Sequence, residues 1–256
     1  MAKLEAQNIV KYFEHDGKPL KAIGGISFTV EDGDFVCLVG PSGCGKSTFL
    51  RIAAGLQKPD EGQILLDNRP ITKTGPDRIM VFQEGALFPW LKVRDNVEFG
   101  LKIAGIPESE RREISDRYLD MMQLSKFANS YTYQLSTGMR QRVAIARALV
   151  MDPEILLMDE PFAALDAQTR DLLLVEMQMI WQKTKKTIVF VTHSISESTV
   201  LGNKVVVFTH RPSTIKKIIP IDHKRPRLVE DEGLIPYQKE ISALLRPEVK
   251  AKEDSS

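Results

Sequence analysis

The sequence predicts an α/β fold in which a mostly parallel sheet is joined by an antiparallel β portion and an inserted helical block. Apolar runs at 35–39, 155–158 and 187–191 are each followed by a helical pattern, which indicates parallel strands covered on both faces. Gly- and Asp-rich turns at 15–17 and 31–34 separate the first strands, as is typical of antiparallel neighbours. Between Asn96 and Val150 the apolar residues follow helical spacing almost throughout.

Short runs of β-type residues give the expected order of strands, which is 6–10, 26–30, 35–39, 62–66, 79–82, 155–158, 187–191 and 204–208. A helix is expected at 48–54, directly after the third run. Two apolar stripes in the helical block are expected to pack in the core; they consist of Ile114, Tyr118, Met121 and Met122, and of Val143, Ala146, Leu149 and Val150. The polar tail after Pro220 contains one short amphipathic piece at 237–245.

The composition argues against several classes of protein. The chain has 256 residues, enough for one large α/β domain or two small ones. Its 35 Lys and Arg balance 34 Asp and Glu, so we expect no nucleic-acid partner. The two cysteines, Cys37 and Cys44, form no C-x-x-C pair, which argues against a disulfide framework or a zinc site. Cys37 lies in an apolar run and is expected to be buried.

The sequence predicts no membrane span of its own. Residues 1–6 lack the apolar segment of a signal peptide, and no run approaches the roughly 18 consecutive apolar residues that suggest a span. We therefore expect a cytosolic chain, which would reach a membrane only by docking on a protein that spans it.

A glycine-rich segment after the third run predicts a nucleoside-triphosphate site. It fits the pattern G-x-x-x-x-G-K-[ST] and consists of Gly40, Pro41, Ser42, Gly43, Cys44, Gly45, Lys46, Ser47 and Thr48. Glycines let several backbone N–H groups approach a phosphate, and the following helix directs its positive end at the anion. Lys46 would reach the β- and γ-phosphates of ATP and Ser47 would ligate Mg²⁺. The alternative, a chance Gly-rich turn, is disfavoured by the strand before it and the helix after it.

Two acids at the end of the apolar run 155–158 support this prediction. Asp159 and Glu160 would be costly there unless a cation or an exposed cleft accepts them. Asp159 would hold the Mg²⁺ shell, and Glu160 would polarise an attacking water as general base. The alternative is a strand that simply meets solvent at Asp159.

A second polar glycine turn, Leu135-Ser136-Thr137-Gly138-Met139-Arg140-Gln141-Arg142, also runs into a helix. It lies far from the first glycine loop along the chain, and the two segments are poorly placed to serve one nucleotide. A chain with one of each holds half of two sites, so the working unit is predicted to be a pair of chains.

The order of these motifs resembles an ABC-type ATPase over roughly residues 4–225. The matching positions are 40–48, Gln83, 135–139, Asp159-Glu160, Ala164-Leu165-Asp166 and His193. The resemblance implies a P-loop NTPase fold with a RecA-like, mostly parallel core, an antiparallel β-subdomain and an inserted helical subdomain. It places the ATP-binding domain at 1–225, with the core at 1–85 and 152–225, the helical subdomain at 86–151 and a short C-terminal tail at 226–256.

The resemblance also implies roles for individual residues. Gln83 would contact Mg²⁺ and relay the nucleotide state, His193 would sense the γ-phosphate, and Phe13, with Tyr12 as competitor, would stack on the adenine. In a head-to-tail pair, Ser136 and Gly138 would reach the γ-phosphate of the neighbour's ATP, although Thr137 and Met139 depart from the commonest form of this segment. Three basic residues of the following helix, Arg140, Arg142 and Arg147, are expected to be solvated or to lie between subunits.

The apolar loop at 84–93 predicts a docking surface for transmembrane permease subunits near Gln83 to Val93. The alternative is that Phe88 and Trp90 pack inside the helical block. Segments 88–93, 159–170 and Arg211-Pro212 to Arg225-Pro226-Arg227 resemble the nitrate, sulfonate and taurine importer branch.

The expected function is therefore that of an ATP-hydrolysing subunit of an importer for a small anion or organosulfur solute. It would act at the cytoplasmic face of the cell membrane, with a second ATP-binding subunit (identical or different) and, indirectly, an extracytoplasmic solute-binding protein. Another substrate or export polarity stays open. A soluble ABC ATPase of DNA repair or translation, or a P-loop kinase, fits the motifs less well.

Overall fold

The computed structural model describes residues 2–83 and 86–253 and contains two sheets in its described part. An antiparallel four-stranded sheet has the order β2-β1-β4-β5 and is formed by β1 (Ala2–His15), β2 (Lys18–Glu31), β4 (Glu61–Leu66) and β5 (Arg69–Pro70). A six-stranded sheet has the order β10-β9-β3-β8-β7-β6. Its strands are β3 (Phe35–Val39), β6 (Arg78–Val81), β7 (Ile155–Asp159), β8 (Thr187–Val191), β9 (Lys204–Phe208) and β10 (Ile215–Pro220). Adjacent strands in this sheet run parallel to each other, except for the antiparallel pair β9 and β10.

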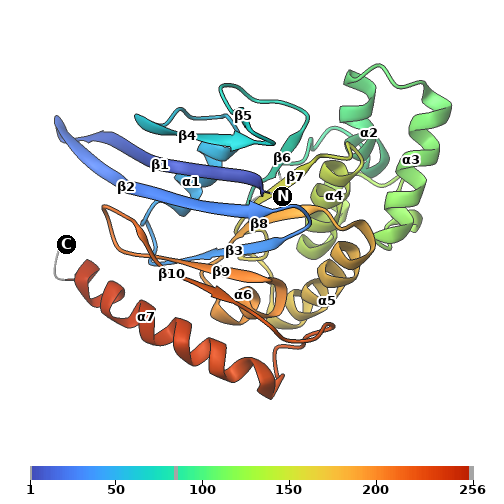
Figure 1. The fold of residues 1–256 in the computed structure, drawn as a ribbon. Helices are drawn as coiled ribbons and strands as arrows, with labels where there is room; N and C mark the ends of the chain where they lie inside the picture. The colour runs from blue at the N-terminus through green and yellow to red at the C-terminus, as the bar shows by residue number, and fades with distance from the viewer. Residues whose placement is uncertain (1, 84–85, 254–256) are drawn as a thin grey trace.

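The helices divide between the two faces of the six-stranded sheet. Helix α1 (Lys46–Ala53) lies between the two sheets, whereas α5 (Ala167–Thr184) and α6 (Ile195–Leu201) cover the opposite face (Figure 1). A separate helical block stands at one end of the molecule and contains α2 (Val93–Ile103), α3 (Glu108–Met121) and α4 (Thr137–Leu149). The described residues also form three short 3-10 helices: η1 (Ser125–Phe127), η2 (Thr132–Gln134) and η3 (Glu232–Leu234).

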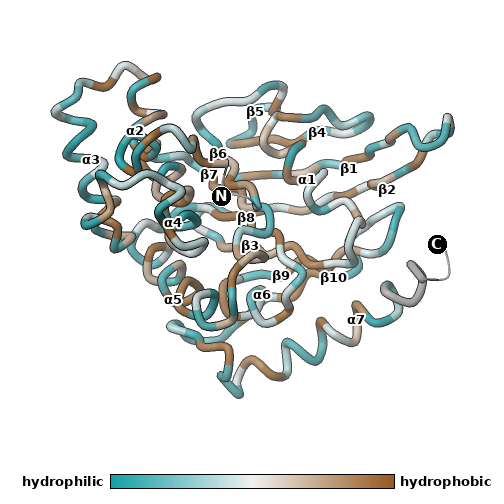
Figure 2. The backbone as a smooth tube through the Cα atoms, turned by 180° about the vertical axis from the view of Figure 1, so that it is seen from behind, coloured by the Kyte–Doolittle hydropathy of each residue, from teal (hydrophilic) through white to brown (hydrophobic). Residues whose placement is uncertain are grey.

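The central strands are apolar throughout because both of their faces are covered. In β3, β7 and β8 every residue is buried. Cys37 and Val39 of β3 face the core formed with α5, α6 and the helical block, and Val36 and Leu38 face the core formed with α1 and the four-stranded sheet. Figure 2 shows these hydrophobic strands inside a more hydrophilic periphery.

The predicted fold class is confirmed, and three strands, β3, β8 and β9, have the predicted bounds. The turn at 15–17 joins the antiparallel pair β1 and β2 as expected. The prediction for the turn at 31–34 was wrong, because this turn leads from β2 into β3, which belongs to the other sheet. Strand β10 was not predicted, because it is an edge strand whose exposed Lys216 and Lys217 break the apolar pattern.

The apolar stripes of the helical block pack in the core as predicted. Met122, Val143, Ala146, Leu149 and Val150 are buried, and the remaining stripe residues pack against them. Cys37 is fully buried, also as expected. Within the described residues, the structure contains no helix with the length and apolar character that a membrane crossing requires.

The C-terminal segment packs on the core through two arginines before it enters helix α7 (Ile235–Glu253). Arg225 donates to the carbonyls of Val200 and Leu201 at the end of α6 and lies over the ring of Trp181. Burial and the neighbouring charge of Arg227 lower the pKa of Arg225 to about 10.

Arg227 is 2% exposed, and its guanidinium donates to main-chain oxygens at four positions: Thr199, Gly202, Ile221 and His223. Its main chain also exchanges two hydrogen bonds with the side-chain amide of Gln178 in α5. Residues beyond 225 are thus joined to α5 and α6 by buried hydrogen bonds, while a domain boundary at 225 stays a prediction.

We expect Arg227→Ala to lower the free energy of unfolding by about 3 kcal/mol, because it leaves buried carbonyls without donors and opens a void. Denaturant titration measures this change. The exposed neighbour Lys224 provides the control, since Lys224→Ala should change stability by less than about 0.5 kcal/mol. Equal stabilities of the two variants would contradict a stabilising role for the Arg227 hydrogen bonds.

Candidate active site

The predicted phosphate loop connects the end of β3 to the start of α1. Gly45 caps α1 at a φ of 106°, a left-handed conformation that favours glycine. Gly40 lies so close to its neighbours that a Cβ there would be 2.9 Å from Phe208 Cβ and 3.0 Å from Cys44 Sγ. The backbone thus forms a tight cradle at a helix N-terminus, which is the arrangement that binds phosphate.

The side chain of Lys46 is folded back onto this loop. It is 5% exposed, and Nζ donates to the carbonyl oxygens of Gly40 at 2.8 Å and Pro41 at 3.1 Å. These carbonyls hold the ammonium group at the cradle, where it complements an anion.

Asp159 ends β7 beside the first turn of α1. Ser47 Oγ donates to Asp159 Oδ1 at 2.7 Å, and burial raises the pKa of this carboxyl while the bond from Ser47 opposes the rise. A hydroxyl, a partly buried carboxylate and the nearby Gln83 amide are oxygen donors of the kind that Mg²⁺ prefers. The donor set therefore fits the expected magnesium ion.

Glu160 and His193 meet at the ends of two neighbouring strands. Glu160 follows β7 with a φ of 46°, an uncommon conformation for a residue other than glycine, and its N–H donates to the Val191 carbonyl at 3.0 Å. Its Oε2 lies 3.1 Å from His193 Nδ1. Backbone conformations of this kind occur at functional sites and also in ordinary turns, such as those at Asp16 and Asp67.

A cavity of about 530 Å³ gathers most of these groups. It is lined by Phe13, Glu14, His15, Leu20, Ala22, Ser42, Gly43, Gly45, Lys46, Ser47, Thr48, Gln83, Glu160 and Arg211. Phe13 lines it and its predicted competitor Tyr12 does not. Asp159 and His193 are not lining residues but contact them, Asp159 through Ser47 and His193 through Glu160. The buried Cys44 thiol packs inward, where burial raises its pKa.

Five lining residues were not predicted as site residues: Glu14, His15, Leu20, Ala22 and Arg211. Two of them, His15 and Arg211, carry basic side chains. His15 is exposed, as expected of an ordinary surface residue, but it also lies at the cavity. Arg211 reaches the cavity from the turn after β9, nearly 200 residues away from His15, and supplies a further cation. No local motif distinguishes His15 or Arg211. The feature that they share is a position at or just after the end of a strand.

The second glycine turn does not join this cavity. None of the described residues between 135 and 142 lines it. Ser136 instead caps α4 by accepting from the Met139 N–H at 3.2 Å. Thr137 is the first residue of α4, a helical position that needs no glycine, and its hydroxyl accepts from Arg140 at 3.0 Å.

Two basic residues after this turn, expected to be solvated or to lie between subunits, make contacts within the chain. Arg142 pairs with Glu176 of α5 at 2.9 Å, and both side chains are mostly buried. Arg147 lies over the Phe88 ring and donates to the Ala86 carbonyl at 2.9 Å. Both arginines join parts of the same chain, because tertiary packing brings α5 and the 86–91 loop against α4.

The apolar loop residues divide between the two predicted alternatives. Phe88 packs against Phe99, with ring centroids 4.5 Å apart, whereas Trp90 is 70% exposed. Beside them lies a hollow of about 420 Å³ between β6, α2 and α4, lined in part by Phe82, Phe88, Phe99, Arg147 and Met151. Glu84 and Gly85, the first residues of the predicted docking loop, lie outside the described residues.

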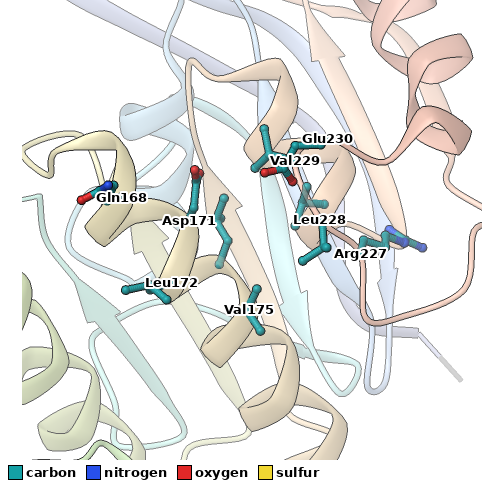
Figure 3. A pocket seen from close by; sticks show the side chains of 10 residues that line it. Gln168, Asp171, Leu172, Val175, Arg227, Leu228, Val229 and Glu230 are labelled. Atoms are coloured by element: carbon teal, nitrogen blue, oxygen red, sulfur yellow. The ribbon is translucent and has the colours of Figure 1, made fainter.

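A third hollow, of about 450 Å³, lies between α5 and residues 227–230. Figure 3 shows Leu172 and Val175 of α5 on one side, Leu228 and Val229 on the other, and the Arg227 side chain directed away from them. It contains no glycine loop, and we assign it no part in nucleotide binding.

The fold and the glycine-loop cavity together define a P-loop nucleoside-triphosphate-binding protein. Residues 23–163 match the protein family described as ABC transporter. The chain is also 51% identical over 247 residues to an uncharacterized ABC transporter ATP-binding protein of Methanocaldococcus jannaschii, a match that covers 96% of this chain and 92% of that protein. The chain therefore belongs to the ABC transporter family.

Named relatives and a solved structure are also similar. A nitrate import ATP-binding protein of Synechocystis is 42% identical over 252 residues, covering 95% of both chains. A taurine import ATP-binding protein of Pelagibacter ubique is 43% identical over 218 residues, covering 85% of this chain and 82% of that one. The structure of a dimeric ATP-binding cassette in a post-hydrolysis state, bound to ADP and Pi, matches with a TM-score of 0.75 and 31% identity, covering 86% of this chain and all of that one.

Proposed function

We propose that this chain binds and hydrolyses ATP as the energy-coupling subunit of an ABC importer. The observation that carries the proposal is the cavity in which the phosphate loop, Gln83 and Glu160 face one another. The first glycine loop supplies N–H donors and Lys46 a cation for the phosphates, and Phe13 supplies a ring for the adenine.

The residues around the γ-phosphate divide the chemistry between them. Ser47, Asp159 and Gln83 would hold Mg²⁺, which when bound neutralises charge on the phosphate oxygens. Glu160 would accept a proton from the attacking water, and His193, 3.1 Å from it, would hold the water and the γ-phosphate in line.

We also propose that two chains share each ATP. The turn at 135–142 does not line the cavity of its own chain, yet it begins α4 with a hydroxyl and a helix N-terminus. In a head-to-tail pair, Ser136 and Gly138 of one chain would complete the cavity of the other. The dimeric cassette among the similar structures supports this arrangement.

The hollow between β6, α2 and α4 is proposed as the dock for a permease subunit. Its lining is largely apolar, and the adjacent Trp90 exposes a large ring to solvent, which is the character of a protein-binding surface. A short helix from a membrane-spanning subunit would fit a groove of this kind and place the chain at the cytoplasmic face.

The solute class follows from the relatives. Proteins named for nitrate and taurine import are more than 40% identical to this chain over most of its length. We therefore propose a small anion or an organosulfur compound as the imported solute. The solute would contact the permease and an extracytoplasmic binding protein and never this chain.

Trp90→Ala is expected to uncouple this chain from its permease and to leave its own ATPase activity unchanged. The chain would be co-purified with its permease subunits, placed in vesicles with the solute-binding protein and assayed with nitrate, taurine or maltose. Nitrate or taurine should stimulate ATP hydrolysis several-fold and maltose should not, and Trp90→Ala should reduce this stimulation about tenfold.

The control variant is Ile103→Ala, which removes an equally exposed apolar side chain (75%) from the other end of α2. Stimulation should persist in this variant. Stimulation by maltose alone would contradict the proposed solute class, and full stimulation in Trp90→Ala would contradict the proposed dock.

A further inference from the structure

Helix α6 begins with a buried carboxylate that lies outside the cavity. Glu197, in the first turn of α6, is 5% exposed, and burial raises the pKa of its carboxyl. An acid buried to this extent requires specific partners, and the described structure supplies them from two directions.

The first direction leads to the turn that carries His193. Thr192 Oγ1 donates to Glu197 Oε2 at 2.5 Å and accepts from the Ser194 N–H at 3.0 Å. Ser194 Oγ in turn accepts from the Glu197 N–H at 3.3 Å. Residues on both sides of His193, Thr192 and Ser194, are thus held by the Glu197 carboxylate and its helix.

The second direction leads to helix α5. Glu197 Oε1 lies 3.5 Å from Arg170 Nε, and Arg170 Nη2 donates to the Leu165 carbonyl at 2.7 Å. Leu165 is the central residue of the Ala164-Leu165-Asp166 segment, and Asp166 caps α5 by accepting from the Thr169 N–H at 2.9 Å. The guanidinium therefore bridges this segment to the start of α6.

The same turn of α5 is packed against the second glycine turn. A Cβ on Gly138 would lie 2.5 Å from Thr169 Cγ2, so the two elements approach as closely as glycine allows. A shift of the Ser136–Gly138 turn would displace Thr169 and, with it, the adjacent Arg170.

We propose that Arg170 and Glu197 are positioning residues that transmit the position of the 164–166 segment and of the Ser136–Gly138 turn to His193. The inference rests on the proposed function, in which the Ser136–Gly138 turn faces a partner chain and His193 serves the chain's own ATP. Binding of the partner's nucleotide at Ser136 would thereby align the histidine of the other site, which makes hydrolysis at the two sites interdependent.

The test uses the full chain and compares Arg170→Gln, Arg170→Lys, Glu197→Gln and the double variant Arg170→Gln/Glu197→Gln. We expect Arg170→Gln and Glu197→Gln each to reduce kcat about ten- to a hundredfold, because small misplacements of a catalytic group have effects of this size. The KM for ATP should stay unchanged, since the phosphate loop and Phe13 are untouched. The double variant should be no worse than either single variant, because residues in one network are not additive. Arg170→Lys, which keeps the charge, should recover part of the loss.

The matched control is Glu176→Gln. Like Glu197, Glu176 is a largely buried glutamate paired with an arginine, but it lies on α5 and its partner is Arg142. This variant is expected to leave kcat unchanged. A wild-type kcat in both Arg170→Gln and Glu197→Gln, or a loss equal to the unfolded fraction measured by circular dichroism, would overturn the inference. If Glu197→Gln fails to fold, the more exposed Arg170 carries the comparison.

A second readout separates this inference from the proposed function. Without nucleotide, amide hydrogen exchange at residues 192–197 should be faster in Arg170→Gln than in Glu176→Gln. Equal exchange in the two variants would overturn the positioning role even in an active protein. A wild-type chain that fails to hydrolyse ATP would instead contradict the proposed function and leave the exchange comparison valid.

Discussion

Glu160→Gln is expected to reduce ATP turnover about a thousandfold, the range associated with loss of a general base. The amide keeps the size of the side chain and can still bond to His193, but it is far too weak a base to accept a proton from water. Because the phosphate loop is unchanged, ATP should still bind with an affinity within a few-fold of wild type. The ATP-bound pair, unable to proceed, should accumulate as a dimer.

Single-turnover hydrolysis and size-exclusion chromatography with ATP measure the two effects. The control is Glu154→Gln, at the opposite end of the same strand, where the carboxylate pairs with Lys3 on the surface. This variant should hydrolyse ATP at the wild-type rate. Near-normal hydrolysis by Glu160→Gln would exclude Glu160 as the base, and loss of ATP binding would indicate a structural role instead.

The second large effect is expected when chains that carry Lys46→Ala are mixed with chains that carry Ser136→Arg. Lys46→Ala removes the buried ammonium group of the phosphate loop, and Ser136→Arg removes the cap of α4 and obstructs access to its N-terminus. Each variant alone should be nearly inactive, because both sites of a homodimer are then damaged.

In a mixed dimer the two defects fall in the same site and leave the other site intact. Random pairing of equal amounts makes about half of the dimers mixed, so the mixture should regain up to about a quarter of wild-type activity. ATPase assays before and after mixing measure the gain, and mixing two Lys46→Ala preparations is the control. Full activity of either variant alone would contradict the shared-site arrangement.

Local chemistry explains why much of the candidate site was predictable. Gly40, Gly45, Lys46 and Ser47 are close neighbours in the sequence, and their roles follow from the turn that they form. Asp159 and Glu160 were predictable because two acids at the end of a buried strand need a cation or a cleft. Strand β3 was predicted to the residue because both of its faces are buried and every side chain in it is apolar.

Other features depend on contacts between distant parts of the chain. The C-terminal helix α7 extends beyond the amphipathic piece at 237–245 in both directions. Its contacts are with α6 and β9, which lie far from it in the sequence. The sequence indicated that Arg142 and Arg147 are solvated or intersubunit charges. In the structure Arg142 pairs with Glu176, and Arg147 packs on the Phe88 ring. Neither partner is within 30 positions, so no local pattern indicates the contact.

By itself the sequence determined the class of the protein and the phosphate loop, because these depend on residue types at short, fixed spacing. Only the tertiary structure decided that Phe13 and not Tyr12 lines the cavity, that Arg211 joins it, and that Glu197 links Arg170 to the His193 turn. These relations depend on how strands and helices far apart in the sequence are brought together, and side-chain packing alone sets their distances.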